Sequence, residues 1–190
     1  RDAGLVAEMQ ATHENTRYLK GFCLHPDLQF STDLGQAITD ADLVFVAIPS
    51  KGFRQVVQAA KPYFQPKQML VSMTKGIEAG TFSLMSQIIR EEVPDARLGV
   101  LSGPNLAKEI AAKMPAGTVI ASLDPELRTL VHQVLACAYF RVFANTDIYG
   151  VELSGALKNI YAIATGMAQA QKVGENTRSM LLTRALAEMS

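Results

Sequence analysis

The chain has 190 residues, in which 18 Lys and Arg balance 18 Asp and Glu to give a formal net charge of +0. Hydrophobic residues make up 48% of the sequence. This content excludes a disordered chain, because so much apolar surface offsets the entropy lost on ordering. The neutral charge balance gives no electrostatic reason to expect nucleic acid or an anionic membrane as a partner.

Cysteine and histidine are sparse. Cys23 and Cys137 are far apart and form no C-x-x-C pattern, and the three histidines have no metal-ligand spacing. The sequence therefore predicts neither a disulfide framework nor a metal site. No apolar run approaches the ~18 residues that a spanning helix needs, so no integral membrane segment is expected. These features favour a protein of the reducing cytoplasm.

Short apolar runs alternate with amphipathic stretches through the first three quarters of the chain. The apolar runs predict strands at residues 43–48, 69–73, 97–101, 117–122 and 141–144. Helices are expected between them, at 53–60, from Phe82 to near Pro94, at 106–112 and from Asp124 to about Cys137. This alternation predicts an α/β fold with a Rossmann-type, mostly parallel sheet and helices on both faces.

The pattern changes after Asp147. Residues 149–171 carry no strand signal, and a further helix is expected from about Asn176. We therefore predict an α/β domain at 1–147 and the first helices of an all-α domain at 148–190. The chain opens at Arg1 without an initiator Met and stops at Ser190 inside a helical pattern, so we expect a piece of a longer protein.

Ligands of open α/β sheets gather outside the carboxyl ends of the strands. Lys75 directly follows the second predicted strand, where its ammonium could hold a phosphate or carboxylate. A solvated loop lysine fits the same position. In residues 102–105 (SGPN), Gly103 lets backbone approach a ligand closely and the next helix offers free N–H groups, although an ordinary capped turn uses the same residues.

Lys158 shares a helical stripe with small residues. Ser154 and Gly155 recur with it at helical spacing, so another segment or a ligand can approach the lysine closely. Partial desolvation there would suit Lys158 to proton transfer. The alternative is a lysine that extends from the edge of the stripe into water. No G-x-G-x-x-G, G-x-x-x-x-G-K-[ST] or G-x-S-x-G pattern occurs.

Five short stretches occur in an order that points to a known family. They are residues 17–21 (RYLKG), 47–50 (AIPS), 74–77 (TKGI), 102–109 (SGPNLAKE) and 150–159 (GVELSGALKN). Together they closely resemble bacterial-type NAD(P)-dependent glycerol-3-phosphate dehydrogenase. The resemblance implies interconversion of sn-glycerol 3-phosphate and dihydroxyacetone phosphate with NAD or NADP, for glycerophospholipid synthesis. A homodimer is also expected.

The resemblance also implies roles for individual residues. Lys158 matches the lysine that exchanges a proton with the substrate oxygen during hydride transfer, and Lys75 matches the lysine between cofactor and substrate. Gly103 and Asn105 match substrate contacts. The implied cofactor contacts, beside Lys75, are Arg1 at the adenosine end, Tyr18, Pro49 and Ala107.

Two departures from the family pattern affect these expectations. The family opens with a strand and a glycine-rich pyrophosphate loop, which this chain lacks, and its further substrate residues lie beyond Ser190. We therefore expect these 190 residues alone to bind cofactor poorly and to be inactive, with an unpaired strand at the sheet edge. The alternatives are a related dehydrogenase of another hydroxy acid or sugar nucleotide, and a non-catalytic anion-binding module.

Overall fold

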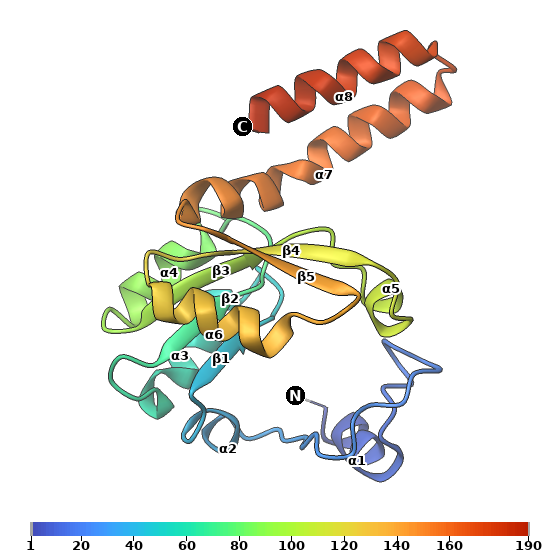
Figure 1. The fold of residues 1–190 in the computed structure, drawn as a ribbon. Coiled ribbons are helices and arrows are strands. Elements are labelled where there is room, and N and C mark those ends of the chain that lie inside the picture. The colour runs from blue at the N-terminus through green and yellow to red at the C-terminus, as the bar shows by residue number, and fades with distance from the viewer. Residues whose placement is uncertain (1, 190) are drawn as a thin grey trace.

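The computed structural model describes residues 2–189 and contains a five-stranded sheet in the order β1-β2-β3-β4-β5 (Figure 1). The strands are β1 (Leu43–Val46), β2 (Met69–Ser72), β3 (Arg97–Ser102), β4 (Ala116–Ala121) and β5 (Phe140–Asn145). β1, β2 and β3 are mutually parallel, β4 runs antiparallel to β3, and β5 is parallel to β4. The predicted α/β fold with a mostly parallel sheet is confirmed.

Helices join the strands and extend the chain beyond them. They are α1 (Ala3–Thr12), α2 (Leu34–Ile38), α3 (Phe53–Ala60), the 3-10 turn η1 (Lys61–Tyr63), α4 (Met85–Glu92), α5 (Ala107–Ala111), α6 (Pro125–Leu135), α7 (Ile148–Ala170) and α8 (Glu175–Met189).

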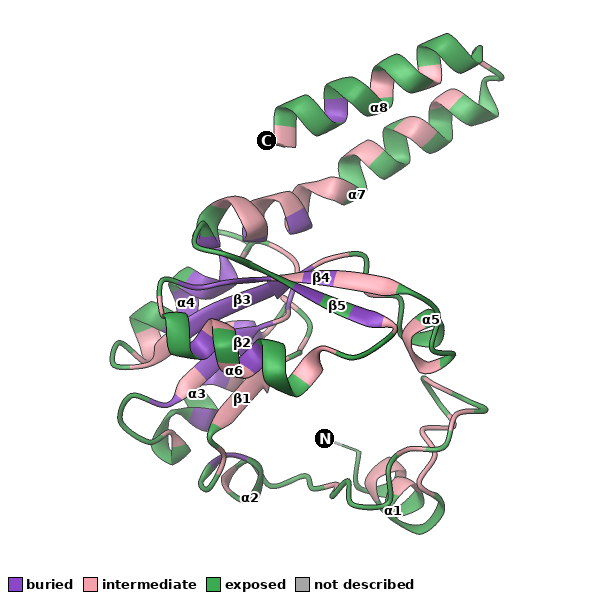
Figure 2. Ribbon diagram, in the orientation of Figure 1, coloured by how far each residue is buried: buried purple, intermediate pink, exposed green. Residues whose placement is uncertain are grey.

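Each face of the sheet is covered by amphipathic helices. On one face, Phe53 of α3 and Ile88 of α4 are fully buried against Leu70 of β2. On the other, Leu127 and Val131 of α6 pack on the sheet, and Figure 2 shows the buried residues gathered along these contacts. Helices on both faces explain why the inner strands are apolar throughout rather than alternating.

The antiparallel strand follows from the short connection before it. Between β3 and β4 the chain forms only α5, a five-residue helix without a buried residue. A parallel connection needs a crossover element that packs on a sheet face. Because α5 contributes only the partly buried Ile110 to the core, it covers too little of the face for a crossover, and β4 pairs in the opposite direction, with Leu101 opposite Ile120.

The N-terminal segment stands apart from the sheet (Figure 1). Within the described part of the chain, the hydrogen bonds and ion pairs of residues 2–30 join them only to one another, for example Arg17 to Asp2 at 3.0 Å. The sequence analysis did not predict α1 or α2. In α1 the apolar residues form no stripe and none is buried, so hydrophobic periodicity gives no signal.

One predicted helix boundary was wrong. Phe82 was expected inside the helix that ends near Pro94, but it is 79% exposed and has a φ of 59°. The turn before α4 places this side chain in solvent, and the helix begins at Met85. The apolar Phe82 side chain therefore contributes nothing to the hydrophobic core.

α7 and α8 form a helical hairpin that extends away from the sheet (Figure 1). Asp147 caps α7 by accepting a hydrogen bond from Gly150 N at 2.9 Å. Near the start of α7, Ser154 Oγ donates a hydrogen bond to Met189 O, at the end of α8, at 3.2 Å. Although α7 has 23 residues, no helix within residues 2–189 is long and apolar enough to cross a bilayer. The domain division at residue 147 stays a prediction.

An arginine joins three elements at the side of the sheet. From α3, the Arg54 guanidinium contacts Glu78, in the loop after β2, with Nη2 and Oε2 2.8 Å apart. Nη1 of the same group reaches Glu91 at 2.6 Å and Glu92 at 2.9 Å, both on α4. Hydrogen bonds from Arg54, then from Thr81, lower the pKa of Glu78 to about 2.

We expect this ion pair to make stability depend on pH. The pKa of Glu78 in the folded protein lies below its ordinary 4.5. The contribution of the ion pair to the free energy of unfolding is therefore complete above about pH 4.5 and is lost as pH falls toward 2. Urea unfolding of Glu78→Gln should therefore show a deficit against wild type that shrinks across this range. The control is Glu175→Gln, which removes an exposed carboxylate and should show no such change with pH. A deficit that does not change with pH would contradict the expectation.

Candidate functional site

The loops that follow β1 and β2 are fixed side by side by Thr74. Its buried hydroxyl accepts a hydrogen bond from Ile48 N at 3.2 Å and donates to Ile48 O at 2.7 Å. At Gly76 the φ is +142°, and a Cβ there would lie 2.8 Å from Cβ of Ser50. These contacts bring Pro49 and Lys75 to the same edge of the sheet, where parallel strands end.

The loop after β3 lies on β4. A Cβ at Gly103 would lie 2.9 Å from the carbonyl oxygen of Gly117, so only glycine allows this approach. Thr118, which is 1% exposed, donates to Ser102 O and accepts from Asn105 Nδ2, both at 3.1 Å. The Asn105 side chain is thereby oriented, and its buried Oδ1 has no hydrogen-bond partner among the described residues.

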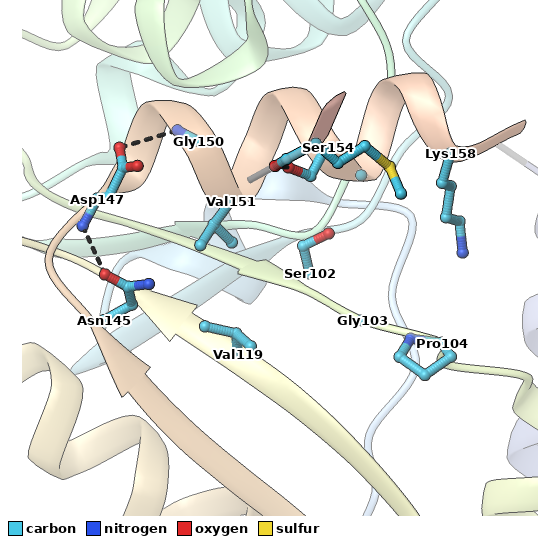
Figure 3. A pocket seen from close by; sticks show the side chains of 12 residues that line it. Ser102, Gly103, Pro104, Val119, Asn145, Asp147, Gly150, Val151, Ser154 and Lys158 are labelled. Atoms are coloured by element: carbon cyan, nitrogen blue, oxygen red, sulfur yellow. Dashed lines mark hydrogen bonds between the residues drawn. The ribbon is translucent and has the colours of Figure 1, made fainter. Parts of the chain in front are cut away.

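α7 approaches this edge at Gly155. A Cβ at residue 155 would overlap the Ser102 hydroxyl and lie 3.8 Å from Lys75 Cε. One turn further along α7, Lys158 lines a cavity of about 470 Å³ together with Ser102 and Gly103. Figure 3 shows the Lys158 side chain extending from α7 toward the loop that holds Gly103 and Pro104. The small-residue stripe predicted from the sequence is therefore the contact face of this helix.

Two lysines lie near each other here, Lys158 in the lining of the cavity and Lys75 beside Gly155. Burial, followed by the charge of Lys158, lowers the pKa of Lys75 below its ordinary 10.5. Within residues 2–189, no carboxylate forms an ion pair with Lys75 or Lys158. Two neighbouring ammonium groups without a carboxylate repel each other, and an anionic ligand between them relieves that repulsion.

A buried carboxylate that the sequence analysis missed lies on the same helix. Glu152 is 3% exposed and accepts hydrogen bonds from Ser86 N, at 3.0 Å, and from Ser86 Oγ. Burial raises the pKa of Glu152, while the bonds from Ser86 oppose that shift. An acidic residue inside the apolar segment that opens α7 was the available signal, but its partner lies 66 residues earlier.

The other expected cofactor residues are not all gathered at this edge. Pro49 is exposed beside the Lys75 loop, and Ala107 is exposed at the first position of α5. Tyr18 is 66% exposed in the N-terminal segment, where the Arg17 guanidinium lies 5.3 Å from its ring centre. Arg1 lies outside the described residues. No group of three His, Cys, Asp or Glu between residues 2 and 189 is arranged to hold a metal ion.

The fold and the paired lysines define a class: a Rossmann-type α/β protein with a site for an anionic ligand where the sheet meets a helical region. Residues 1–128 match the family model of the NAD-dependent glycerol-3-phosphate dehydrogenase N-terminus, and residues 147–190 match that of its C-terminus. The chain belongs to the NAD-dependent glycerol-3-phosphate dehydrogenase family, which confirms the resemblance seen in the sequence.

Individual relatives agree with the family models. Glycerol-3-phosphate dehydrogenase [NAD(P)+] of Acinetobacter baylyi is 59% identical over the whole chain, which covers 53% of that protein. A crystal structure of glycerol-3-phosphate dehydrogenase from Coxiella burnetii matches 99% of the chain at 35% identity with a TM-score of 0.89, and 57% of that structure is covered. The Plasmodium falciparum enzyme matches 97% of the chain at 28% identity with a TM-score of 0.91, over 52% of its length. The chain therefore spans about half the length of these relatives.

Two glycines of α7 allow a matched test of the close approach. We expect Gly155→Ala to destabilise the protein by about 1–3 kcal/mol, because the added methyl group overlaps Ser102. Gly166→Ala, on the same helix with nothing within 4 Å, should instead stabilise it by roughly 0.5–1 kcal/mol through helix propensity. Chemical denaturation measures both. Equal effects would show that α7 does not depend on contact at residue 155.

Proposed function

We propose that the protein interconverts sn-glycerol 3-phosphate and dihydroxyacetone phosphate by hydride exchange with NAD or NADP. The observation that carries this proposal is the pair Lys75 and Lys158, brought to one edge of a Rossmann-type sheet without an ion-pair partner among residues 2–189. Two ammonium groups suit a substrate that has both a phosphate and a reacting oxygen. Family membership supports the same reaction.

The described residues fit one end of a dinucleotide cofactor. Exposed Ala47 and Pro49 end the β1 segment beside Lys75, and the glycine turn at residue 76 keeps that edge free of a further side chain. NADH or NADPH, when bound, supplies the hydride. We include Tyr18, Ala107 and Arg1 in the proposed cofactor contacts, and Gly103 and Asn105 in those to substrate.

Lys158 is the proposed acid and base. In the reducing direction, its ammonium donates a proton to the carbonyl oxygen as hydride reaches carbon 2, and the resulting neutral amine regains a proton from solvent. In the oxidising direction, the neutral amine takes the proton of the hydroxyl group. Lys75 orients the substrate by charge, because its ammonium attracts phosphate or carbonyl oxygen.

The biological setting belongs to the same proposal. We place the enzyme in the cytoplasm, where its product serves glycerophospholipid synthesis. Two free cysteines, Cys23 and Cys137, suit a reducing compartment. We further propose a homodimer. Exposed apolar side chains on the hairpin, such as Ile160 at 59% and Ile163 at 64%, support additional packing there.

Removing the Lys158 amine tests the proposed acid and base. In the full-length gene product, we expect Lys158→Ala to lower kcat for dihydroxyacetone phosphate reduction at least ~100-fold, with NADH affinity unchanged. Loss of NADH absorbance measures turnover, and quenching of NADH fluorescence measures binding. Lys61→Ala, an exposed lysine on η1, is the control. Wild-type turnover in Lys158→Ala would remove this residue from the mechanism.

Anion affinity should depend on the protonation of Lys75. A bound phosphate favours the charged ammonium, whereas burial beside Lys158 disfavours it in the free site. Binding then takes up a proton, so affinity for glycerol 3-phosphate should fall as pH rises through the lowered pKa, before pH 10.5. Titration calorimetry across this range measures the effect. Lys75→Met should remove that part of the pH dependence, and an unaltered profile would count against the role of Lys75.

A further inference from the structure

Glu152 is a buried charged group that the proposed reaction does not use. Glu152 is 3% exposed, and it lies on α7 six residues before Lys158. Burying a carboxylate carries a large desolvation cost unless hydrogen bonds replace the lost water. The position therefore requires partners that compensate the burial, and these are found on α4.

Helix α4 lacks an acceptor at its own N-terminus. The N-cap residue is Leu84, whose side chain cannot accept the hydrogen bonds that the first N–H groups of a helix need. Gln87 satisfies only Leu84 N, at 2.7 Å. Glu152 accepts from Ser86 N at 3.0 Å and from Ser86 Oγ, and its negative charge faces the positive end of the helix dipole. Glu152 thus caps α4 from another part of the chain.

The capped end of α4 is also the end of the segment that begins with Lys75. Within this segment, Ile77 pairs with Leu84, and Glu78 N donates to Ser83 O at 2.9 Å. Arg54 holds Glu78 from α3, and Met85 is fully buried in the core. A rigid loop therefore connects Lys75 to the point where Glu152 binds.

On the other side of the contact, Glu152, Gly155 and Lys158 succeed one another at three-residue intervals on α7. Such positions are neighbours on a helix surface, and six residues rise about 9 Å. Between the two charged residues, Gly155 lies so close to Ser102 that a Cβ would overlap its hydroxyl, and that Cβ would lie 3.8 Å from Lys75 Cε. The helix is therefore fixed at Glu152, lies against the strand ends at Gly155, and presents Lys158 one turn later.

We propose that Glu152 is a positioning residue, which holds α7 on the capped end of α4 and thereby sets the spacing between Lys158 and Lys75. This inference rests on the proposed function. The Glu152 carboxylate caps α4 and, by the same contact, fixes the position of α7 relative to the segment that carries Lys75. Loss of the cap frees α7 to move away from the sheet edge.

The test compares two substitutions in the full-length gene product. Glu152→Ala removes both hydrogen bonds, and we expect kcat for dihydroxyacetone phosphate reduction to fall at least ~10-fold, the scale on which misplaced catalytic groups act. Glu152→Gln keeps an acceptor for Ser86 N and a donor for its hydroxyl, so it should restore most of the activity. Ile89→Val, which trims a fully buried side chain of α4, controls for destabilisation alone.

A second readout does not depend on turnover. Lysines reductively methylated with ¹³C report their own titration by NMR. In Glu152→Ala the pKa of Lys75 should rise toward its ordinary value, because Lys75 becomes less buried and the charge of Lys158 moves away. If Glu152→Ala does not accumulate as folded protein, Ser86→Ala, which removes only the hydroxyl bond, should give smaller changes in the same directions.

The outcomes separate the two proposals. Folded Glu152→Ala with wild-type kcat and an unchanged Lys75 titration would overturn the positioning role. So would equal losses in Glu152→Gln, Glu152→Ala and Ile89→Val, since these would reflect stability alone. A wild-type protein that does not reduce dihydroxyacetone phosphate would instead refute the proposed function, and the Lys75 titration would still decide whether Glu152 sets the spacing.

Discussion

The site depends on how closely α7 lies on the carboxyl ends of the strands. At Gly155 an added Cβ would overlap the Ser102 hydroxyl and lie 3.8 Å from Lys75 Cε, so a side chain there would push the helix away from Ser102. This one approach brings a lysine from a helix to a lysine from a strand-end loop, across about 80 residues of sequence. The pair of lysines therefore belongs to the junction between the sheet and the helical hairpin, and neither part contains it alone.

Bringing two ammonium groups together has an electrostatic cost. The α/β core meets it by fixing the loops that carry the site: Thr74 ties Lys75 to the neighbouring loop, and Thr118 orients Asn105. The fixed loop and helix α7 keep the backbones of Lys75 and Lys158 near each other. The repulsion between the two ammonium groups then remains in the free site, and an anionic ligand placed between them would relieve it.

The sequence predicts the sheet and the small-residue face of α7 because both leave local periodic patterns. Strand boundaries agree within one or two residues, since the apolar runs at β1, β2 and β3 are closed by polar or turn residues. Phe82 misled the helix prediction because apolar character does not report backbone conformation, and its φ is positive. The reversed direction of β4 depends on how much of the sheet face α5 covers, which is a tertiary property.

Glu152 could not be found from spacing, because its role is defined by what α4 lacks. A leucine at an N-cap position is unfavourable for an isolated helix, and this local inconsistency is resolved by a residue 66 positions away. Such a contact makes the ends of two helices mutually dependent: α4 needs the carboxylate, and the buried carboxylate needs the N–H groups of α4. Because each group is costly to leave unpaired, the junction has a single favourable register, and the distance between the two lysines follows from it.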